Sequence, residues 1–309
     1  MKLKIPSSLQ EISSLIKAKA IGKDDFPITG LNEIHKVEKG DLTFVDHPKY
    51  YEKALQSAAT TILINKEVEC PVGKALIISD DPFRDYNILT SHFRKFRSSE
   101  KLISDEASIG ENTIIQPGVF VGHHAAIGKN CLVHSGVVIY NHCVVGNNVI
   151  IHANTVIGSD AFYFKRRSEG YDKLISCGRV IVEDDVEIGA CCTIDKGVSG
   201  DTVVGKGTKM DNHVHVGHDT VIGKNCLFAA QVGIAGVVTI EDDVILWGQV
   251  GVQKDLTIGK GAVVLGQSGI GKSLEGNKTY FGSPVRDARD KMKEIALMKR
   301  LPELIQKLD

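Results

Sequence analysis

The chain has 309 residues and a formal net charge of -1, with 37 Lys and Arg against 38 Asp and Glu. This balance argues against a dedicated nucleic-acid binder, because such proteins neutralise phosphates with a basic face. No apolar run approaches the roughly 20 residues of a membrane-spanning helix, and the opening MKLKIPSSLQEI lacks the apolar core of a signal peptide.

The first 100 residues are predicted to form a small α/β domain, because helical spacing alternates with short apolar runs of strand length. Serine, aspartate and proline stand where helix caps and first turns are expected. A helix is expected at 9–16, capped by Ser7 or Ser8. Residues 40–55 should form a strand, a turn at His47-Pro48 and then a helix. Strands are expected at 61–64 and 75–78, and a further helix after Asp81-Pro82.

From Ile103 to Ile157 every sixth residue is aliphatic. The frame then resumes with apolar first positions, and it covers twenty-five hexads with two breaks. The second hexad position is often glycine, and the fifth is usually small. A period of six fits neither an α-helix nor a simple alternating strand. It fits a solenoid that turns a corner every six residues. The 31 glycines beside a single tryptophan agree with such a repeat.

Three such sides close one coil of eighteen residues, and each short strand should send its first residue inward. Coils stacked about 4.8 Å apart, about eight in number, would form a prism on the order of 40 Å long. Four of the seven cysteines, Cys131, Cys143, Cys192 and Cys226, occupy fifth positions and are predicted to be small buried residues. The cysteines include no CxxC pair, which favours reduced thiols and a cytoplasmic location.

The repeat is broken at 163–181 by a stretch rich in aromatic and basic residues, and again at 200–203. An insertion in a solenoid leaves the prism as a loop, which either is solvated or lines a pocket. After Ile270 the repeat fades, and heptad-like spacing from Val285 predicts a helix that Pro302 interrupts or restarts. A lone amphipathic helix needs another surface against which its apolar side can pack, and homotrimerisation would supply that surface.

These patterns predict a mainly β fold in three parts. A left-handed parallel β-helix of hexapeptide repeats should occupy 101–280, with a loop insertion at 163–181. An α/β domain at 1–100 should precede it, and a C-terminal helix or helices at 281–309 should follow it.

Candidate chemistry lies between Met210 and Gly236, where His213, His215 and His218 fall within the repeat. His218 and Gly236 are both third residues of their hexads and stand one coil apart, so their main chains should be about one strand spacing apart. A histidine can accept a proton from a nucleophile, and a backbone N–H can stabilise an oxyanion. This pair suits acyl transfer without a covalent enzyme intermediate.

A zinc site is the competing interpretation of the three histidines. It would resemble that of the γ-class carbonic anhydrases, which share this prism and bind zinc between subunits. However, the ligand atoms of one zinc ion must converge at about 2.0–2.1 Å. His213, His215 and His218 occupy hexad positions four, six and three, which spreads them around a corner. We therefore expect no metal ligand here, and surface or interface positions for His213 and His215.

Three segments give the chain a specific family resemblance: LTFVDHPKY at 42–50, the run from IVEDDVEIGACC to VHVGHD at 181–219, and KTYFGSPVRDARDKM at 278–292. With them, the chain closely resembles the UDP-3-O-(3-hydroxyacyl)glucosamine N-acyltransferases of lipid A synthesis over essentially its whole length. The hexads alone are weak evidence, because many acyltransferases have them.

The resemblance implies a homotrimer that takes a 3-hydroxyacyl group from the phosphopantetheine of acyl carrier protein, with no other cofactor. The acceptor would be the 2-amine of a UDP-linked monoacylated glucosamine. It implies His218 as the general base and the Gly236 amide as the oxyanion donor. Phe44 and Tyr50 match the positions that sandwich the uracil, which makes the first domain a uridine-binding domain.

The chain departs from the family pattern at two places. His47 stands where the family has asparagine, although histidine can also donate and accept hydrogen bonds. Lys254 and Asp255 stand where some members carry a second histidine, so no second catalytic histidine is expected. The basic residues Arg286, Arg289, Lys291 and Lys293 would suit an acidic carrier protein, or simply form a solvated face with the acidic residues among them.

Three other functions remain as alternatives. The O-acyltransferase that acts earlier in the same pathway has a similar His-Asp motif but no N-terminal domain of this kind. A nucleotidyltransferase–acetyltransferase fusion is disfavoured because no glycine-rich phosphate loop occurs near the start. A non-catalytic scaffold is the third alternative.

Overall fold

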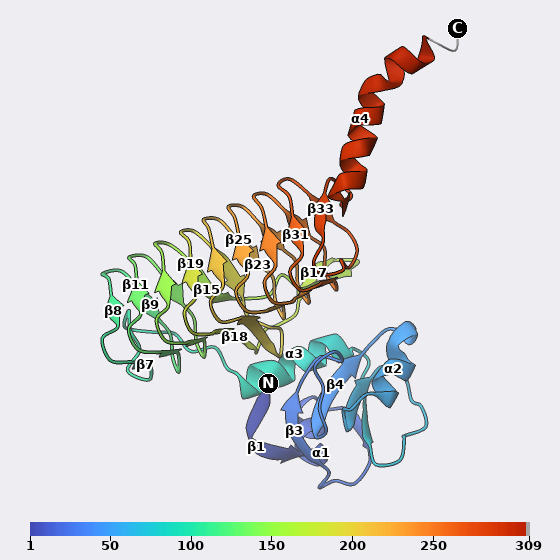
Figure 1. The fold of residues 1–309 in the computed structure, drawn as a ribbon. Coiled ribbons are helices and arrows are strands. Elements are labelled where there is room, and N and C mark those ends of the chain that lie inside the picture. Colours follow the sequence, from blue (N-terminus) through green and yellow to red (C-terminus); the bar gives the residue numbers. More distant parts are fainter. Residues whose placement is uncertain (307–309) are drawn as a thin grey trace. The chain divides into compact units, whose positions relative to one another are not determined.

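The computed structural model describes residues 1–306 (Figure 1). The chain divides into two compact units. The first comprises Met1–Ser98, Asp160–Arg179 and Lys196–Asp201, and the second contains the rest of the described chain. Two short stretches from within the repeat region therefore belong with the N-terminal residues.

The first unit is built on a six-stranded sheet with the order β1-β3-β4-β5-β6-β2. The central strands β3 to β6 are parallel, and β1 and β2 pair antiparallel at the two edges. The elements are β1 (Lys2–Ser8), α1 (Leu9–Leu15), β2 (Lys19–Ile21), β3 (Pro27–Leu31), β4 (Asp41–Val45), the short 3-10 helix η1 (Pro48–Tyr50), α2 (Tyr51–Gln56), β5 (Thr61–Ile64), β6 (Ala75–Ile78) and α3 (Pro82–Phe93).

The predicted elements of this unit are confirmed, and their ends have local causes. Ser8 caps α1 in a capping box, because its hydroxyl accepts from the Glu11 N–H at 3.2 Å while the Glu11 carboxylate accepts from the Ser8 N–H at 2.8 Å. Asp81 caps α3, with Pro82 in the first turn. The sequence does not predict strands β1, β2 and β3. Two of them are the edge strands, whose exposed residues lack a clear apolar alternation.

The longer break in the sequence pattern, at 163–181, contains a β-hairpin. Strand β16 (Phe164–Arg167) pairs antiparallel with β17 (Gly170–Lys173). Around it, Ala161, Leu174 and Cys177 are buried in the same apolar cluster as Phe83 of α3. The insertion therefore contributes to the first unit's core at its base, while the hairpin itself is largely exposed.

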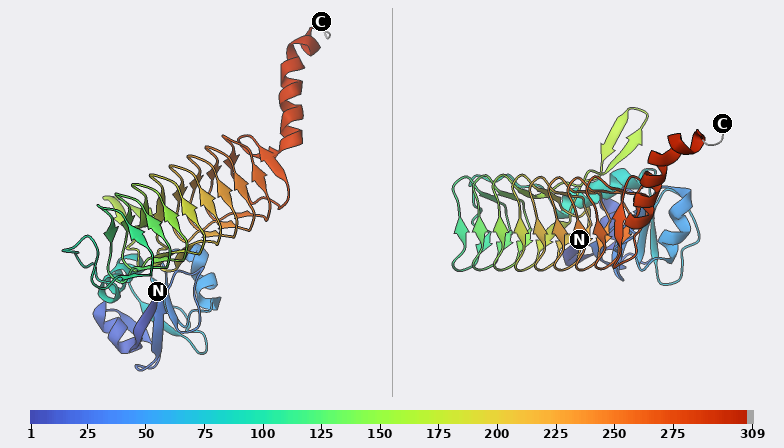
Figure 2. Two further views of the ribbon diagram at one scale, coloured as in Figure 1. Left: turned by 60° about the vertical axis from the view of Figure 1, so that its left-hand side comes forward. Right: turned by 45° about the horizontal axis from the view of Figure 1, so that its top comes forward.

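In the second unit, the coils stack into three sheets (Figure 2). Their strands are parallel except for β34, which pairs antiparallel with β33. The first holds β7 (Ser108–Ile109), β10 (Ala126–Ile127), β13 (Val144–Val145), β18 (Arg179–Val182), β21 (Asp201–Val204), β24 (Val221–Ile222), β27 (Thr239–Ile240) and β30 (Thr257–Ile258). The second holds β8 (Ile114–Ile115), β11 (Leu132–Val133), β14 (Ile150–Ile151), β19 (Glu187–Ile188), β22 (Lys209–Met210), β25 (Leu227–Phe228), β28 (Ile245–Leu246), β31 (Val263–Val264), β33 (Thr279–Phe281) and β34 (Arg286–Asp287). The third holds β9 (Phe120–Val121), β12 (Val138–Ile139), β15 (Val156–Ser159), β20 (Thr193–Asp195), β23 (His215–Val216), β26 (Gly233–Ile234), β29 (Gly251–Val252) and β32 (Gly269–Ile270).

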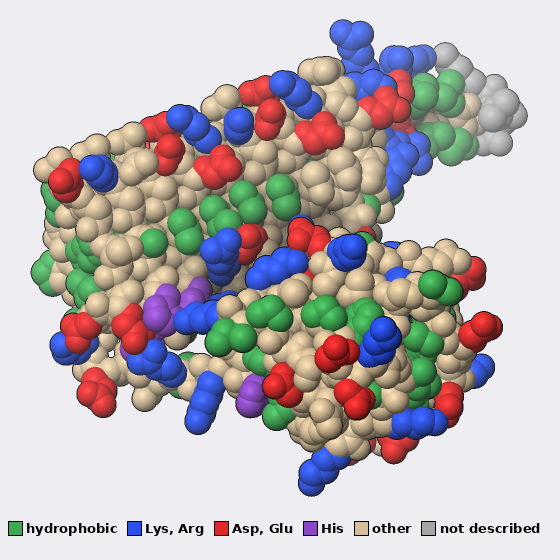
Figure 3. Space-filling model, turned by 90° about the horizontal axis from the view of Figure 1, so that it is seen from below, with side chains coloured by type: hydrophobic (Ala, Val, Ile, Leu, Met, Phe, Trp, Pro, Cys, Tyr) green, Lys and Arg blue, Asp and Glu red, His purple; other side chains and the backbone are tan. Residues whose placement is uncertain are grey.

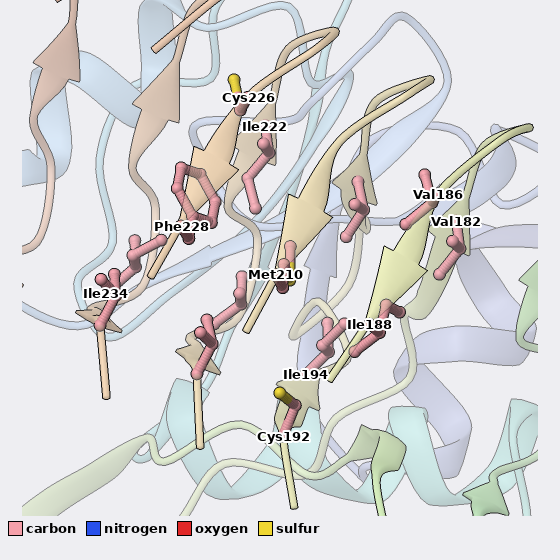
Figure 4. Packing of buried hydrophobic residues seen from close by; sticks show 14 of the residues in the cluster. Val182, Val186, Ile188, Cys192, Ile194, Met210, Ile222, Cys226, Phe228 and Ile234 are labelled. Atoms are coloured by element: carbon pink, nitrogen blue, oxygen red, sulfur yellow. The ribbon is translucent and has the colours of Figure 1, made fainter. Parts of the chain in front are cut away.

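This arrangement confirms the predicted parallel β-helix. Partners such as Val216 and Ile234 are eighteen residues apart in adjacent strands, as the hexad frame requires. First-position residues fill the interior, where Met210 and Phe228 pack among isoleucines and valines (Figure 4). The first coil is the exception to the inward prediction: Ile103 is 37% and Ile109 39% exposed, because a terminal coil has a neighbour on one side only.

The corners of the coils have a common backbone conformation at the fourth hexad position. Residues such as Asn130, Asp219 and Gln249 adopt positive φ of 56° to 62°, the left-handed region that asparagine, aspartate and glycine tolerate best. The fifth position then points back inside, and the four fifth-position cysteines are all buried as predicted. Positions three and four therefore present their side chains at the corner.

The last described helix is α4 (Ala288–Ile305), which extends from the last coil (Figure 1). The predicted interruption at Pro302 is wrong, because the helix continues through it. Proline lacks an N–H and costs one intrahelical hydrogen bond, but the turn beyond it is closed by the Gln306 N–H donating to the Pro302 carbonyl at 3.2 Å. No described α4 side chain is buried. In residues 1–306, we find no helix with the length and apolar composition needed to cross a membrane.

Candidate active site

His218 lies at a corner of the solenoid, directly after β23, beside Asp219 in the left-handed conformation. Its Nδ1 stands 3.0 Å from Oδ2 of Asp219, and the two side chains are 13% and 0% exposed. The Asp219 main chain is fixed in turn, because its N–H donates to the Thr202 hydroxyl at 2.8 Å. A carboxylate accepts only, so Nδ1 carries the proton and Nε2 is the basic nitrogen of the neutral ring.

The imidazole of His218 lies against Gly236, the third residue of its hexad on the next coil. A Cβ built on Gly236 would come within 2.5 Å of His218 Nε2 and 2.8 Å of both adjoining ring carbons. The two corners are joined by the Val237 N–H, which donates to the His218 carbonyl at 2.8 Å. Glycine is thus required here by the close approach of the ring and not by its own φ.

The Gly236 N–H differs from comparable groups elsewhere in the solenoid. At several corners, the third-position N–H donates to an Asn or Asp side chain one coil later. Examples are Lys129 to Asn147 at 2.9 Å and Lys224 to Asp242 at 2.8 Å. The residue one coil after Gly236 is Lys254, whose side chain has no acceptor to offer. Within residues 1–306 the Gly236 N–H has no hydrogen-bond acceptor, which suits it to a ligand oxygen.

The Lys254 and Asp255 side chains form an exposed ion pair of 3.4 Å and are 80% and 59% exposed. Such pairs hold side chains weakly. The Asp255 N–H donates to the Gly236 carbonyl at 3.4 Å, so this coil supports the Gly236 peptide through its backbone.

The other two histidines of the stretch lie apart from this corner. His213 is exposed at its own corner with φ of 61°, and His215 Nδ1 lies 2.8 Å from the Thr193 hydroxyl. Among the described residues, the ligand atoms of His213, His215 and His218 do not gather within reach of one ion. These three side chains are therefore not arranged as ligands of one zinc ion.

The predicted uracil-binding residues lie in the first unit, on β4 and the turn after it. Phe44 packs against Tyr86 at 4.7 Å and Phe83 at 6.0 Å between ring centroids, so one of its faces belongs to the core. Tyr50 is 46% exposed, and its ring lies 5.9 Å from that of His47.

His47 combines a structural role with a hydrogen-bonding group for a ligand. Its Nδ1 accepts from the Lys49 N–H at 3.2 Å and so caps η1. In the neutral ring Nε2 is then the donor. That donor can serve where the family has an asparagine amide.

Sequence reasoning missed two features of the site. The first is the role of Asp219 as the partner that fixes the His218 tautomer, although the His-Asp dipeptide is its signal. The second is the unpaired state of the Gly236 N–H. Its signal is Lys254 at a position where asparagine or aspartate occurs on other coils.

Comparison with known proteins agrees with this fold. The family model for UDP-3-O-(3-hydroxymyristoyl) glucosamine N-acyltransferase, LpxD, matches residues 25–92, and that for bacterial transferase hexapeptide repeats matches 124–159 and 201–236. Among solved structures, the UDP-N-acetylglucosamine acyltransferase from Bacteroides fragilis is 26% identical, with a TM-score of 0.56 over 62% of this chain and 74% of that one. The corresponding enzyme from Campylobacter jejuni, at 20% identity and TM-score 0.56 over 60% and 71%, shows the fold alone.

The class is therefore an acyltransferase built on hexapeptide repeats. Two relatives identify the family within this class of acyltransferases. The UDP-3-O-acylglucosamine N-acyltransferase of Fusobacterium nucleatum is 47% identical over 96% of both chains, and that of Campylobacter lari is 40% identical over 68% of this chain and 72% of its own. The chain belongs to the UDP-3-O-acylglucosamine N-acyltransferase family, LpxD, of lipid A synthesis.

Proposed function

We propose that this protein transfers a 3-hydroxyacyl chain from acyl carrier protein to the 2-amine of UDP-3-O-acyl-glucosamine, with His218 as general base. The observation that carries the proposal is the corner shared by His218 and Gly236. A basic nitrogen and an unpaired backbone N–H meet there, as acyl transfer through a tetrahedral intermediate requires.

The chemistry follows from these groups. A protonated amine cannot attack, so Nε2 of His218 takes a proton as the amine nitrogen bonds to the thioester carbon. The carbonyl oxygen becomes an oxyanion, which the Gly236 N–H stabilises. When this intermediate collapses, the C–S bond breaks and the leaving sulfur takes the proton from the His218 imidazolium. The products are an amide and the free thiol of the carrier's phosphopantetheine.

Asp219 assists at each stage. Its buried carboxylate keeps the proton on Nδ1 before attack, and it stabilises the imidazolium that forms afterwards. Because the thioester is already activated, positioning and one oxyanion donor can supply most of the remaining rate enhancement. We therefore propose that the reaction needs no metal ion and no cofactor beyond the phosphopantetheine that the donor carries.

The nucleotide end of the acceptor is assigned to the first unit. Phe44 and Tyr50 offer aromatic faces for the uracil, and His47 offers a hydrogen-bond donor. Aromatic stacking on a base is worth about 1–3 kcal/mol per base. These residues would therefore select a uridine nucleotide while the corner in the second unit performs the transfer.

We also propose a homotrimer, because α4 has no buried side chain among its described residues and carries an apolar surface (Figure 3). The exposed apolar residues on it are Met292, Leu297, Met298, Leu301, Leu304 and Ile305. Three copies of a three-sided body placed around one axis would bury them together.

Acyl carrier protein is proposed to meet the basic residues at the start of α4. Of these, Lys291 and Lys293 already pair with Glu294 and Asp290 at 3.2 and 3.5 Å. An acidic carrier would have to compete with these pairs, and exposed charges are screened by salt. Binding to the carrier should therefore weaken at high salt.

The deciding experiment incubates purified protein with a series of 3-hydroxyacyl carrier proteins and either UDP-3-O-acyl-glucosamine or UDP-N-acetylglucosamine, with products identified by mass spectrometry. We expect an amide product from the first acceptor only. His218→Ala should abolish transfer while the oligomer stays intact. An ester product from UDP-N-acetylglucosamine would instead favour the O-acyltransferase alternative, and an unaffected rate in His218→Ala would end the catalytic assignment.

A further inference from the structure

The hairpin β16–β17 is joined to α3 by side-chain contacts in the first unit. The Asn87 side chain on α3 makes two hydrogen bonds to the end of the hairpin and the residues after it. Its Nδ2 donates to the Lys173 carbonyl at 2.8 Å, and its Oδ1 accepts from the Ile175 N–H at 2.8 Å. Arg84 adds an ion pair to Asp172 at 2.8 Å. These contacts restrain the hairpin beside α3, so that a side chain on it can hold a neighbouring segment.

Lys165 on β16 makes such a contact. Its Nζ lies 5.7 Å from the centre of the Phe83 ring and pairs with the carboxylate of Asp46. The two side chains are 32% and 19% exposed, so the pair is partly shielded from water. Asp46 follows β4 directly and precedes His47, which starts the turn carrying Tyr50.

The turn at 46–50 is otherwise held by its own 3-10 helix, in which the Tyr50 N–H donates to the His47 carbonyl at 2.9 Å, and by Asn65. Asn65 Nδ2 donates to the Asp46 carbonyl at 3.1 Å, and Tyr51 donates to the side chain of the same Asn65 at 2.7 Å. Tyr50 itself is half exposed. Since any freedom left in this turn is lost when a ligand binds, an ion pair that restrains the turn beforehand improves binding.

We infer that Lys165 is a positioning residue for the nucleotide: by holding Asp46, it fixes the turn that presents His47 and Tyr50 to the base. This inference rests on the proposed function only in assigning the uracil to these residues. It gives the insertion at 163–181 a role that its sequence did not indicate. Lys165 acts through Asp46, so its loss should weaken nucleotide binding and leave the transfer step unchanged.

Arg167 provides a matched control on the same strand. Its guanidinium carbon also lies 5.7 Å from the centre of the Phe83 ring, but the group pairs with Asp81 at 2.9 Å and with Asp172 at 3.0 Å. It therefore ties the hairpin to the start of α3 and not to the turn after β4. Losing it should loosen the hairpin to a similar degree without releasing His47 and Tyr50.

The test measures binding of UDP alone by isothermal titration calorimetry, together with KM for UDP-3-O-acyl-glucosamine and kcat. In Lys165→Met, we expect the Kd for UDP and the KM to rise about tenfold, with kcat within about twofold of wild type. Lys165→Arg should restore binding, and Arg167→Met should stay within about twofold of wild type. Asp46→Asn should match Lys165→Met, and the double variant should be no weaker than either single one, because both remove the same pair.

An unchanged Kd in Lys165→Met and Asp46→Asn would overturn the inference. So would an equal loss of binding in Arg167→Met, which would reveal only general loosening, or a wild-type protein that does not bind UDP. A wild type that binds UDP with the expected pattern of variants but transfers no acyl chain would contradict the proposed function and leave this inference standing. If Lys165→Met fails to fold, Asp46→Asn and Lys165→Arg decide the question.

Discussion

The imidazole of His218 rests against the Cα of Gly236, one coil further along the solenoid, so closely that a methyl group there would come within 2.5 Å of Nε2. This contact brings an imidazole nitrogen and a backbone N–H to one corner. It also means that the pair tolerates little change, since neither the ring nor the corner can move without disturbing the other.

Gly236→Ala should therefore lower kcat by about 100-fold or more. The added methyl pushes the ring away from its place and disturbs the N–H that faces the ligand. Removing one oxyanion donor alone costs about 100- to 1000-fold. Steady-state kinetics beside a thermal melt would separate this loss from a loss of folded protein.

The matched control for this variant is Gly233→Ala on β26. A Cβ at Gly233 meets no atom within 4 Å, and the residue does not have the left-handed φ that favours glycine. Its melting temperature and kcat should therefore stay close to those of wild type. Equal losses in both variants would mean that the solenoid simply does not accept alanine in this region, and the argument from the His218 contact would fail.

Asp219→Asn should lower kcat by about 10- to 100-fold, because the carboxylate that orients His218 and holds the proton on Nδ1 is replaced by an amide. Asparagine accepts the left-handed φ of 56° at this corner, so the fold should survive. Steady-state kinetics of the single and double variants give the check. Adding Asp219→Asn to His218→Ala should cost nothing more, and a further loss would show that Asp219 acts independently of the histidine.

The cysteines should differ sharply in reactivity. Burial raises the pKa of the Cys192 and Cys226 thiols to about 11. At pH 8 only about one in a thousand of these thiols would be the reactive thiolate, and the fraction rises only as the pH approaches 11. Exposed Cys191 should therefore react with iodoacetamide first, as read by mass spectrometry. Cys191→Ser should remove the fast label, and rapid labelling of Cys192 or Cys226 in folded protein would contradict their burial.

Tyr50→Ala and Phe44→Leu should separate nucleotide binding from folding. Tyr50 is half exposed and outside the core, so its loss should raise the Kd for UDP about tenfold with little change in melting temperature. Phe44 also packs on Tyr86, so its variant should lower both UDP affinity and stability, the latter by about 1 kcal/mol. Calorimetry with UDP and thermal melts measure the two effects, and unchanged UDP binding in Tyr50→Ala would remove that residue from the site.

Leu297→Glu combined with Leu301→Glu should break the proposed trimer. The two side chains are 58% and 49% exposed and lie one helical turn apart, so charges there would oppose any packing of α4 against another copy. Sedimentation velocity should show a smaller species, while Lys299→Glu on the same helix should sediment as wild type. A wild-type protein that sediments as a monomer would exclude the trimer outright.

Much of the fold was predictable because its rule is local and repeated. Each first hexad position points inward and is filled by an apolar residue, and each fifth position is filled by a small one. This pattern recurs every six residues. The pairing of His218 with Gly236 followed from the same period. In the first unit, the capped helices and the buried strands β4, β5 and β6 were predictable for a similar reason. The edge strands β1 and β2 carry little apolar pattern, and β3 was not predicted either.

The sequence by itself thus determined the solenoid, its eighteen-residue coil and the candidate base and donor. Only the tertiary structure decided what surrounds them. The contact between Asp219 and His218 depends on a left-handed corner, and the unpaired Gly236 N–H depends on which side chain the next coil supplies. The contact of Lys165 with Asp46 joins residues far apart in the chain. Such contacts have no period, so no local pattern indicates them.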